Sequence, residues 1–163
     1  MQVDFFVQGG RTTSMQEVFG LCDVPPACID EENSDRWIAV VRNRHTQMVE
    51  FYAIDGCVTW HRADGSQAKA CDGMLAYNTR KNVVFVELKD RNPRQKQWRI
   101  NAEEQLKSTI ECFRSNHDAG SVSIRAYTCN RQTLFDVGEA EYLQRFKEQT
   151  GITLRVCREI VIG

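Results

Sequence analysis

The sequence predicts one domain of the α/β (α+β) class, with helices flanking a mixed central β-sheet. Residues 83–88 are almost all β-branched or aromatic, which is typical of a buried strand. Residues 101–116 place apolar side chains at helical spacing, which predicts an amphipathic helix. Residues 121–129 then alternate apolar and polar side chains like a second strand. This order predicts a helix packed on one face of a mixed sheet.

A further strand is expected just before residue 83. Residues 71–77 have strand-like alternation, and residues 78–82, Asn-Thr-Arg-Lys-Asn, are polar like a turn. In an antiparallel hairpin, Asp72 would begin one strand where Glu87 ends the other, so their side chains would meet. Lys89 lies two residues after Glu87 and therefore on the same face of its strand.

These charges have two interpretations. A Glu-x-Lys pair at the end of a strand is often a simple exposed ion pair. Two carboxylates that converge beside a lysine favour a metal site instead, because buried charge is costly unless an ion or solvent compensates it. Carboxylate oxygens suit Mg²⁺, which takes few of them and keeps several waters.

The pattern of Asp72, a spacer, Glu87-x-Lys89 and a following helix that carries Gln105 resembles the core of the PD-(D/E)xK nuclease superfamily. That superfamily includes restriction endonucleases, repair nucleases and Holliday-junction resolvases. The resemblance spans roughly residues 70–130 of the chain. It departs from the motif's name at Cys71, which stands where the name places proline.

The resemblance implies a restriction-endonuclease-like core, with Mg²⁺ or Mn²⁺ as the cofactor and nucleic acid, expected to be DNA, as the substrate. It implies that Asp72, Glu87 and the carbonyl of Leu88 hold the metal. Lys89 would position the nucleophile or neutralise the transition state. Gln105 would order the lysine or a metal-bound water.

The segment that follows, residues 91–99, is strongly basic and contains a tryptophan. Beside a metal site, Arg91, Arg94 and Lys96 would hold phosphates, and Trp98 would stack on a base. The alternative is a solvated loop whose Trp98 packs back on the domain. The formal net charge of −1 argues against a broad nucleic-acid footprint, so any basic surface must be local.

The helix over residues 101–116 is expected to begin at Asn101, which can cap it. Gln105 lies roughly 80° from the centre of its apolar face, at about 100° per residue. It is therefore a flank position, which suits either a role at the site or a hydrogen bond to backbone. The buried face is expected to consist of Ala102, Leu106, Thr109, Ile110 and Phe113.

Three regions are expected along the chain: N-terminal strands and loops (1–69), the nuclease-like core (70–130), and a C-terminal helix and strand (131–163). Within the first region we expect a strand at 3–7 and a loop at 8–35, with a possible helical turn at 14–21. Residues 38–41 and 49–54 fit a hairpin better than a helix. Residues 138–150 are expected to be helical and capped by Gly151, with a last strand at 152–157.

The composition narrows the possible classes of protein. A length of 163 residues favours a single domain. No apolar run reaches the roughly 18 residues of a membrane span, and the N-terminus has no basic leader, so a cytoplasmic location without a membrane partner is expected. The seven cysteines include no Cys-x-x-Cys pair and are expected to be reduced core residues.

Three functions remain open at this point. The first is a metal-dependent nuclease that hydrolyses phosphodiester bonds. The second is a catalytically inactive nuclease-like module that binds nucleic acid or protein. The third is another class of enzyme altogether. Asp55 and His61 precede Asp72 on a segment that could border the site, but they fit polar residues of loops and turns better.

Overall fold

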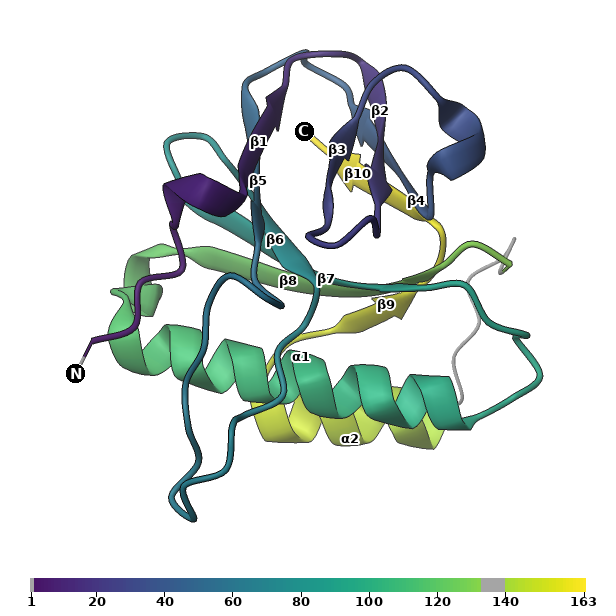
Figure 1. The fold of residues 1–163 in the computed structure, drawn as a ribbon. Helices are drawn as coiled ribbons and strands as arrows, with labels where there is room; N and C mark the ends of the chain where they lie inside the picture. The colour runs from purple at the N-terminus through teal and green to yellow at the C-terminus, as the bar shows by residue number, and fades with distance from the viewer. Residues whose placement is uncertain (1, 133–139) are drawn as a thin grey trace.

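The computed structural model describes residues 2–132 and 140–163, whose elements form three layers (Figure 1). The middle layer is a six-stranded mixed sheet in the order β1-β5-β6-β7-β8-β9. From β1 to β7 neighbouring strands are antiparallel, whereas β8 and β9 continue parallel to β7. The strands are β1 (Arg11–Ser14), β5 (Val49–Ala53), β6 (Gly73–Tyr77), β7 (Asn82–Lys89), β8 (Ser123–Asn130) and β9 (Leu154–Val156).

A second mixed sheet covers one face of the first. It has four strands in the order β10-β4-β2-β3, and the β10–β4 pair is parallel. Residues from both sheets, including Phe19, Val41, Phe51 and Val84, form one buried cluster between them. The strands are β2 (Val18–Cys22), β3 (Cys28–Asp30), β4 (Ala39–Asn43) and β10 (Glu159–Ile162).

Two helices cover the opposite face of the six-stranded sheet: α1 (Gln97–Asn116) and α2 (Ala140–Thr150). A second buried cluster joins them to the sheet, with Phe85 of β7, Phe113 of α1 and Phe146 of α2 among its members. Neither helix in the described part of the chain is both long and apolar enough to cross a bilayer. Gly151 follows α2 with a φ of +76°, as expected for a left-handed cap.

The centre of the chain follows the prediction closely. β7 is buried on both faces because α1 packs on one and the second sheet on the other. The hairpin of β6 and β7, the helix and the parallel strand β8 occur in the expected order. α1 begins at Gln97 rather than at Asn101, and Asn101 accepts a hydrogen bond from the Gln97 side chain inside the helix. Trp98 is buried in the core and anchors this additional turn.

The N-terminal third departs from the prediction. Residues 3–7 form no strand, since the N–H groups of Val3 and Phe5 donate to side chains of Asn116 and His117 rather than to a neighbouring strand. Residues 8–35 are not a loop with a helical turn, because they contain β1, β2 and β3. These strands have three to five residues each, which is too short to show a clear alternation.

The expected hairpin of residues 38–41 and 49–54 is also wrong in its pairing. Both strands exist, as β4 and β5, but they lie in different sheets. β4 pairs with β2 and β10, while β5 pairs with β1 and β6. Both edges of each strand are therefore occupied, and the short connection between them passes from one sheet to the other. β10 was not expected, and residues 138 and 139 of the predicted second helix lie outside the described residues.

Gly73, the first residue of β6, gives a test of this packing. A Cβ at this position would lie 2.2 Å from Cζ of the fully buried Phe51 and 2.8 Å from the Tyr52 carbonyl oxygen. We expect Gly73→Ala to lower the free energy of unfolding by about 1–3 kcal/mol, the usual cost of overpacking a core. Urea denaturation measures it, with Gly9→Ala as the control, because a Cβ at Gly9 meets nothing described within 4 Å. Equal stability of the two variants would contradict the described packing.

Candidate functional site

Asp72 and Glu87 meet where the pairing of β6 with β7 ends. The last paired residues are Gly73 and Val86, so Asp72 and Glu87 are the next pair along the two chains. The Asp72 N–H donates to Oε1 of Glu87 at 3.0 Å, and the Leu88 N–H donates to Oδ2 of Asp72 at 2.6 Å. Each carboxylate thus binds the backbone of the other strand and replaces a ladder hydrogen bond.

Both carboxyl groups are buried, and both have a raised pKa. Asp72 is 9% exposed and Glu87 is 1% exposed. Burial first, and then the negative charge of Glu87, raises the pKa of Asp72 from 3.8 to about 9, so without a metal the two carboxyl groups favour sharing one proton near neutral pH. Burial raises the pKa of Glu87 as well, although Asp72 and Lys89 act in the opposite direction. The pair therefore lacks enough positive charge to ionise fully.

Lys89 and Gln105 complete this group of side chains. The ammonium of Lys89 lies 2.9 Å from Oε2 of Glu87 and donates to Oε1 of Gln105 at 3.4 Å. The Gln105 amide donates to the carbonyl of Ala70 at 3.2 Å, so Gln105 also joins α1 to the segment before β6. The helix flank position predicted for Gln105 does place it beside the lysine, and it bonds to backbone as well.

These residues form the floor of a pocket of about 540 Å³. One wall comes from the second sheet, whose β2–β3 connection lies above the ends of β6 and β7, with α1 on the other side (Figure 1). No local pattern in the sequence indicates the lining residues from this wall, because the second sheet itself was not expected. The lining residues from the second sheet and its connections are Asp23, Val24, Arg36 and Ile38.

Acidic and basic side chains both surround the floor. Asp55 lines the pocket, as considered from the sequence, whereas His61 lines a different groove. Burial first, and then the charge of Asp55, raises the pKa of Asp23. Arg131, which follows β8, lines the pocket beside Arg91 and was not identified from the sequence. Its position depends on β8 lying next to β7, which only the sheet order reveals.

The donor set at the floor fits a divalent cation of the magnesium type. No cluster of three or more His, Cys, Asp and Glu side chains suited to a metal is found in residues 2–132 and 140–163. The set at this position is instead two carboxylates and a backbone carbonyl, all oxygen donors. Since the Leu88 N–H faces the β6 edge to reach Asp72, the Leu88 carbonyl lies on that same edge, beyond the last paired residue of β6.

Of the residues expected to bind substrate, the structure places only one in the pocket. Arg91 lines the pocket. Arg94 and Lys96 are exposed on the same connection between β7 and α1, outside the pocket lining. Trp98 is only 6% exposed, and its ring N–H donates to the carbonyl of Asn92 at 3.0 Å. Trp98 therefore packs back on the domain, as the alternative interpretation held, and its ring is not available to stack on a base.

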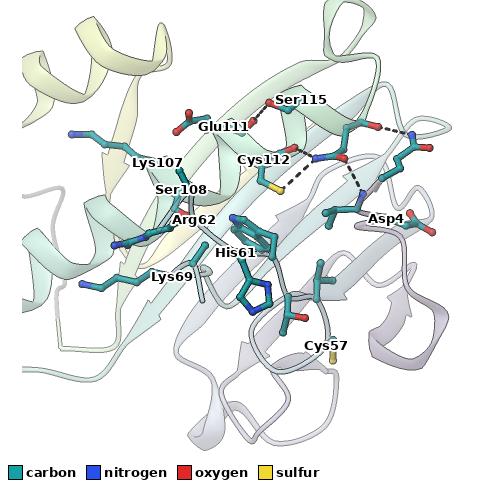
Figure 2. A pocket seen from close by; sticks show the side chains of 18 of the residues that line it. Asp4, Cys57, His61, Arg62, Lys69, Lys107, Ser108, Glu111, Cys112 and Ser115 are labelled. Carbon is teal, nitrogen blue, oxygen red and sulfur yellow. Dashed lines mark hydrogen bonds between the residues drawn. The ribbon is translucent and has the colours of Figure 1, made fainter. Parts of the chain in front are cut away.

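A larger groove of about 1300 Å³ lies between the outer side of α1 and the segment around His61 (Figure 2). Figure 2 shows Arg62, Lys69 and Lys107 toward one end and Asp4 toward the other. Lys69 pairs with Glu104, and Lys107 pairs with Glu103, so most of this positive charge is neutralised. Because this groove has no pair of contacting buried carboxylates in its described lining, the smaller pocket is the candidate site.

The proton shared by Asp72 and Glu87 predicts how the free energy of unfolding depends on pH when no metal is bound. Because the folded pKa of Asp72 is about 9 and the ordinary value is 3.8, wild-type stability falls as pH rises between these values. In Asp72→Asn, the amide can accept from Leu88 and donate to Glu87, as protonated Asp72 does. We expect the variant to match wild type near pH 4 and to exceed it at pH 9 by on the order of 1–3 kcal/mol.

Denaturation in chelator at several pH values makes this measurement. Asp90→Asn is the control, since Asp90 is an exposed acid that lines the same pocket. If Asp72→Asn were instead the less stable protein at pH 9, ionised Asp72 would be a stabilising member of a structural ion pair, and the shared proton would be ruled out.

Comparisons of the chain with protein-family models, with curated proteins and with solved structures find no match. The function is therefore inferred from the residues and the geometry of the pocket.

Proposed function

We propose that this chain is a metal-dependent nuclease of the PD-(D/E)xK type with a restriction-endonuclease-like core, and that it hydrolyses phosphodiester bonds in nucleic acid. One observation carries the proposal. Asp72 and Glu87 are buried together at the floor of a pocket, with Lys89 as the adjacent cation. Two contacting carboxylates with one lysine leave a deficit of positive charge, which a divalent cation at this position would supply.

The surrounding structure supports the same proposal. A hairpin followed by the helix that carries Gln105 is the arrangement that the resemblance implies for the motif, and both elements are present. The Leu88 carbonyl lies on the side of β7 that faces Asp72. These oxygen donors would hold Mg²⁺ or Mn²⁺. When bound, the metal would lower the pKa of a coordinated water and stabilise negative charge on the phosphate.

Hydrolysis forms a bond from water oxygen to phosphorus and breaks a phosphorus–ester oxygen bond. The leaving oxygen takes a proton, and the products are a phosphomonoester and a hydroxyl group. Lys89 is the chain's own cation at the floor and would stabilise charge that develops on the phosphate. Gln105 holds the Lys89 ammonium from the side of α1. Glu87 accepts from both Lys89 and the Asp72 N–H, so its position is determined by two partners.

An inactive nuclease-like binding or adaptor module is the second candidate, and one feature favours it. The reciprocal hydrogen bonds of Asp72 and Glu87 also strengthen the end of the hairpin, which is a structural role. The two candidates differ in whether the pocket binds a divalent cation. Titration calorimetry with Mg²⁺ and Mn²⁺ distinguishes them directly.

The catalytic prediction concerns cleavage of single-stranded, duplex and branched DNA and of RNA. We expect activity with Mg²⁺ or Mn²⁺ and none in chelator. Glu87→Gln should lower the rate at least about a hundredfold, because it removes ligand charge worth several kcal/mol. Lys89→Ala should also lower the rate strongly yet keep metal binding, since an ammonium cannot act as a ligand. Gln105→Ala should lower the cleavage rate less than either of these variants.

Glu104→Gln is the matched control, because Glu104 is an exposed acid of α1 paired with Lys69 outside this pocket. It should leave cleavage unchanged. If wild type and Glu87→Gln are equally inactive on all substrates and neither binds a divalent cation, the nuclease proposal fails and the adaptor takes its place.

A further inference from the structure

The depth and walls of the pocket restrict what can reach the carboxylates. Glu87 is 1% exposed, so a reacting phosphate has to enter between α1 and the second sheet. The volume of about 540 Å³ is that of a small-ligand site. A base-paired duplex carries its second strand and stacked bases beside each phosphate. An unpaired strand can turn its bases outward and pass through a narrow space.

The wall that comes from the second sheet is held in place. Arg131, at the end of β8, donates to the carbonyl of Asp35 in the short helix η2 (Ser34–Arg36). Arg158 donates to the carbonyl of Trp37, the residue that follows η2, at 3.1 Å. The Trp37 ring N–H donates to Asp30 at 2.8 Å. These bonds join η2 and Trp37 to the end of β8, to the segment before β10 and to β3, so this part of the wall is tied down.

Three arginines from separate parts of the chain line the pocket. Arg36 comes from η2, Arg91 follows β7, and Arg131 follows β8. A guanidinium binds a phosphate through two parallel hydrogen bonds and also stacks on a base face. Val24, which is 48% exposed, adds an apolar surface to the same lining. Guanidinium groups together with an apolar contact suit the successive phosphates and a splayed base of one strand.

From these observations we infer that the pocket takes an unpaired strand of nucleic acid, whose flanking phosphates Arg36, Arg91 and Arg131 bind while the scissile phosphate would meet Lys89 and the metal ion that Asp72 and Glu87 would hold. This inference rests on the proposed nuclease function and adds its substrate class. It also assigns substrate contacts to Arg36 and Arg131, which lie far from the motif in the sequence. Because η2 is tied to the end of β8 and to the segment before β10, we expect this wall to hinder the second strand of an intact duplex.

The experiment compares binding and cleavage of one sequence in unpaired and fully paired form. Glu87→Gln reports binding without turnover, measured by fluorescence anisotropy of a labelled strand of roughly 10 nucleotides, the size range of a small single-strand site. Wild type with Mg²⁺ or Mn²⁺ reports cleavage. DNA and RNA strands are both tested, because both carry a phosphodiester backbone and the pocket could accept either. We expect the unpaired strand to bind about tenfold or more tightly than the blunt duplex.

Arginine variants locate the strand on the protein. In the Glu87→Gln background, Arg36→Ala, Arg91→Ala and Arg131→Ala should each weaken binding roughly three- to tenfold and reduce the salt slope by about 1, as for a lost phosphate contact. Arg62→Ala is the matched control, since Arg62 lines the larger groove (Figure 2). Arg91 lies on an exposed connection, so its variant keeps the test valid if loss of Arg131 disturbs folding.

The outcomes separate the two proposals. A duplex bound and cut as well as the unpaired strand would overturn this inference and leave the nuclease function standing. An Arg62→Ala effect equal to that of Arg36→Ala would place the strand elsewhere and would also overturn it. If no strand is cut and no divalent cation binds, the nuclease function itself fails.

Discussion

The site is organised around the reciprocal hydrogen bonds between Asp72 and Glu87, at the point where β6 and β7 stop pairing. Backbone N–H groups that lose their ladder partners need other acceptors, and here the opposite strand's carboxylate supplies them. This fixes both carboxyl groups against rigid elements rather than on a loop. It also forces two acids into contact in a buried position, which leaves a charge deficit that Lys89 only partly offsets.

The burial of that pair is imposed by the layers on both faces of β7. α1 covers the face on which Glu87 lies, and the second sheet covers the other. The same two layers extend past the end of β7 and become the walls of the pocket. A protein without the second sheet would have the same motif on an open edge. The second sheet thus turns a strand-end pair into an enclosed site, and it contributes Asp23, Val24 and Arg36 to the lining.

The sequence predicts a feature of this structure well when the residues that determine it are close together in the sequence, and poorly when they are far apart. β7, the β6–β7 hairpin and α1 arise from local patterns, and their residues therefore place Asp72, Glu87, Lys89 and Gln105 correctly together. The second sheet joins β10 to β4, strands more than a hundred residues apart, and its strands β2 and β3 are too short to show alternation. Residues that reach the pocket through this sheet carry no local signal. Arg131 is a similar case, because its place depends on β8 lying beside β7.

Trp98 is a single residue for which the sequence pattern predicts the wrong role. A tryptophan among arginines and lysines has the composition of a stacking platform, but composition does not say where the following helix begins. Because α1 starts at Gln97, Trp98 lies in its first turn and faces the core. The arginines of the pocket then come from three segments rather than from one basic loop. With a formal net charge of −1 and screening over about 10 Å at 0.1 M salt, the protein as a whole has little long-range attraction for a polyanion. Affinity must therefore come from short-range contacts inside the pocket, where the substrate and the carboxylates meet.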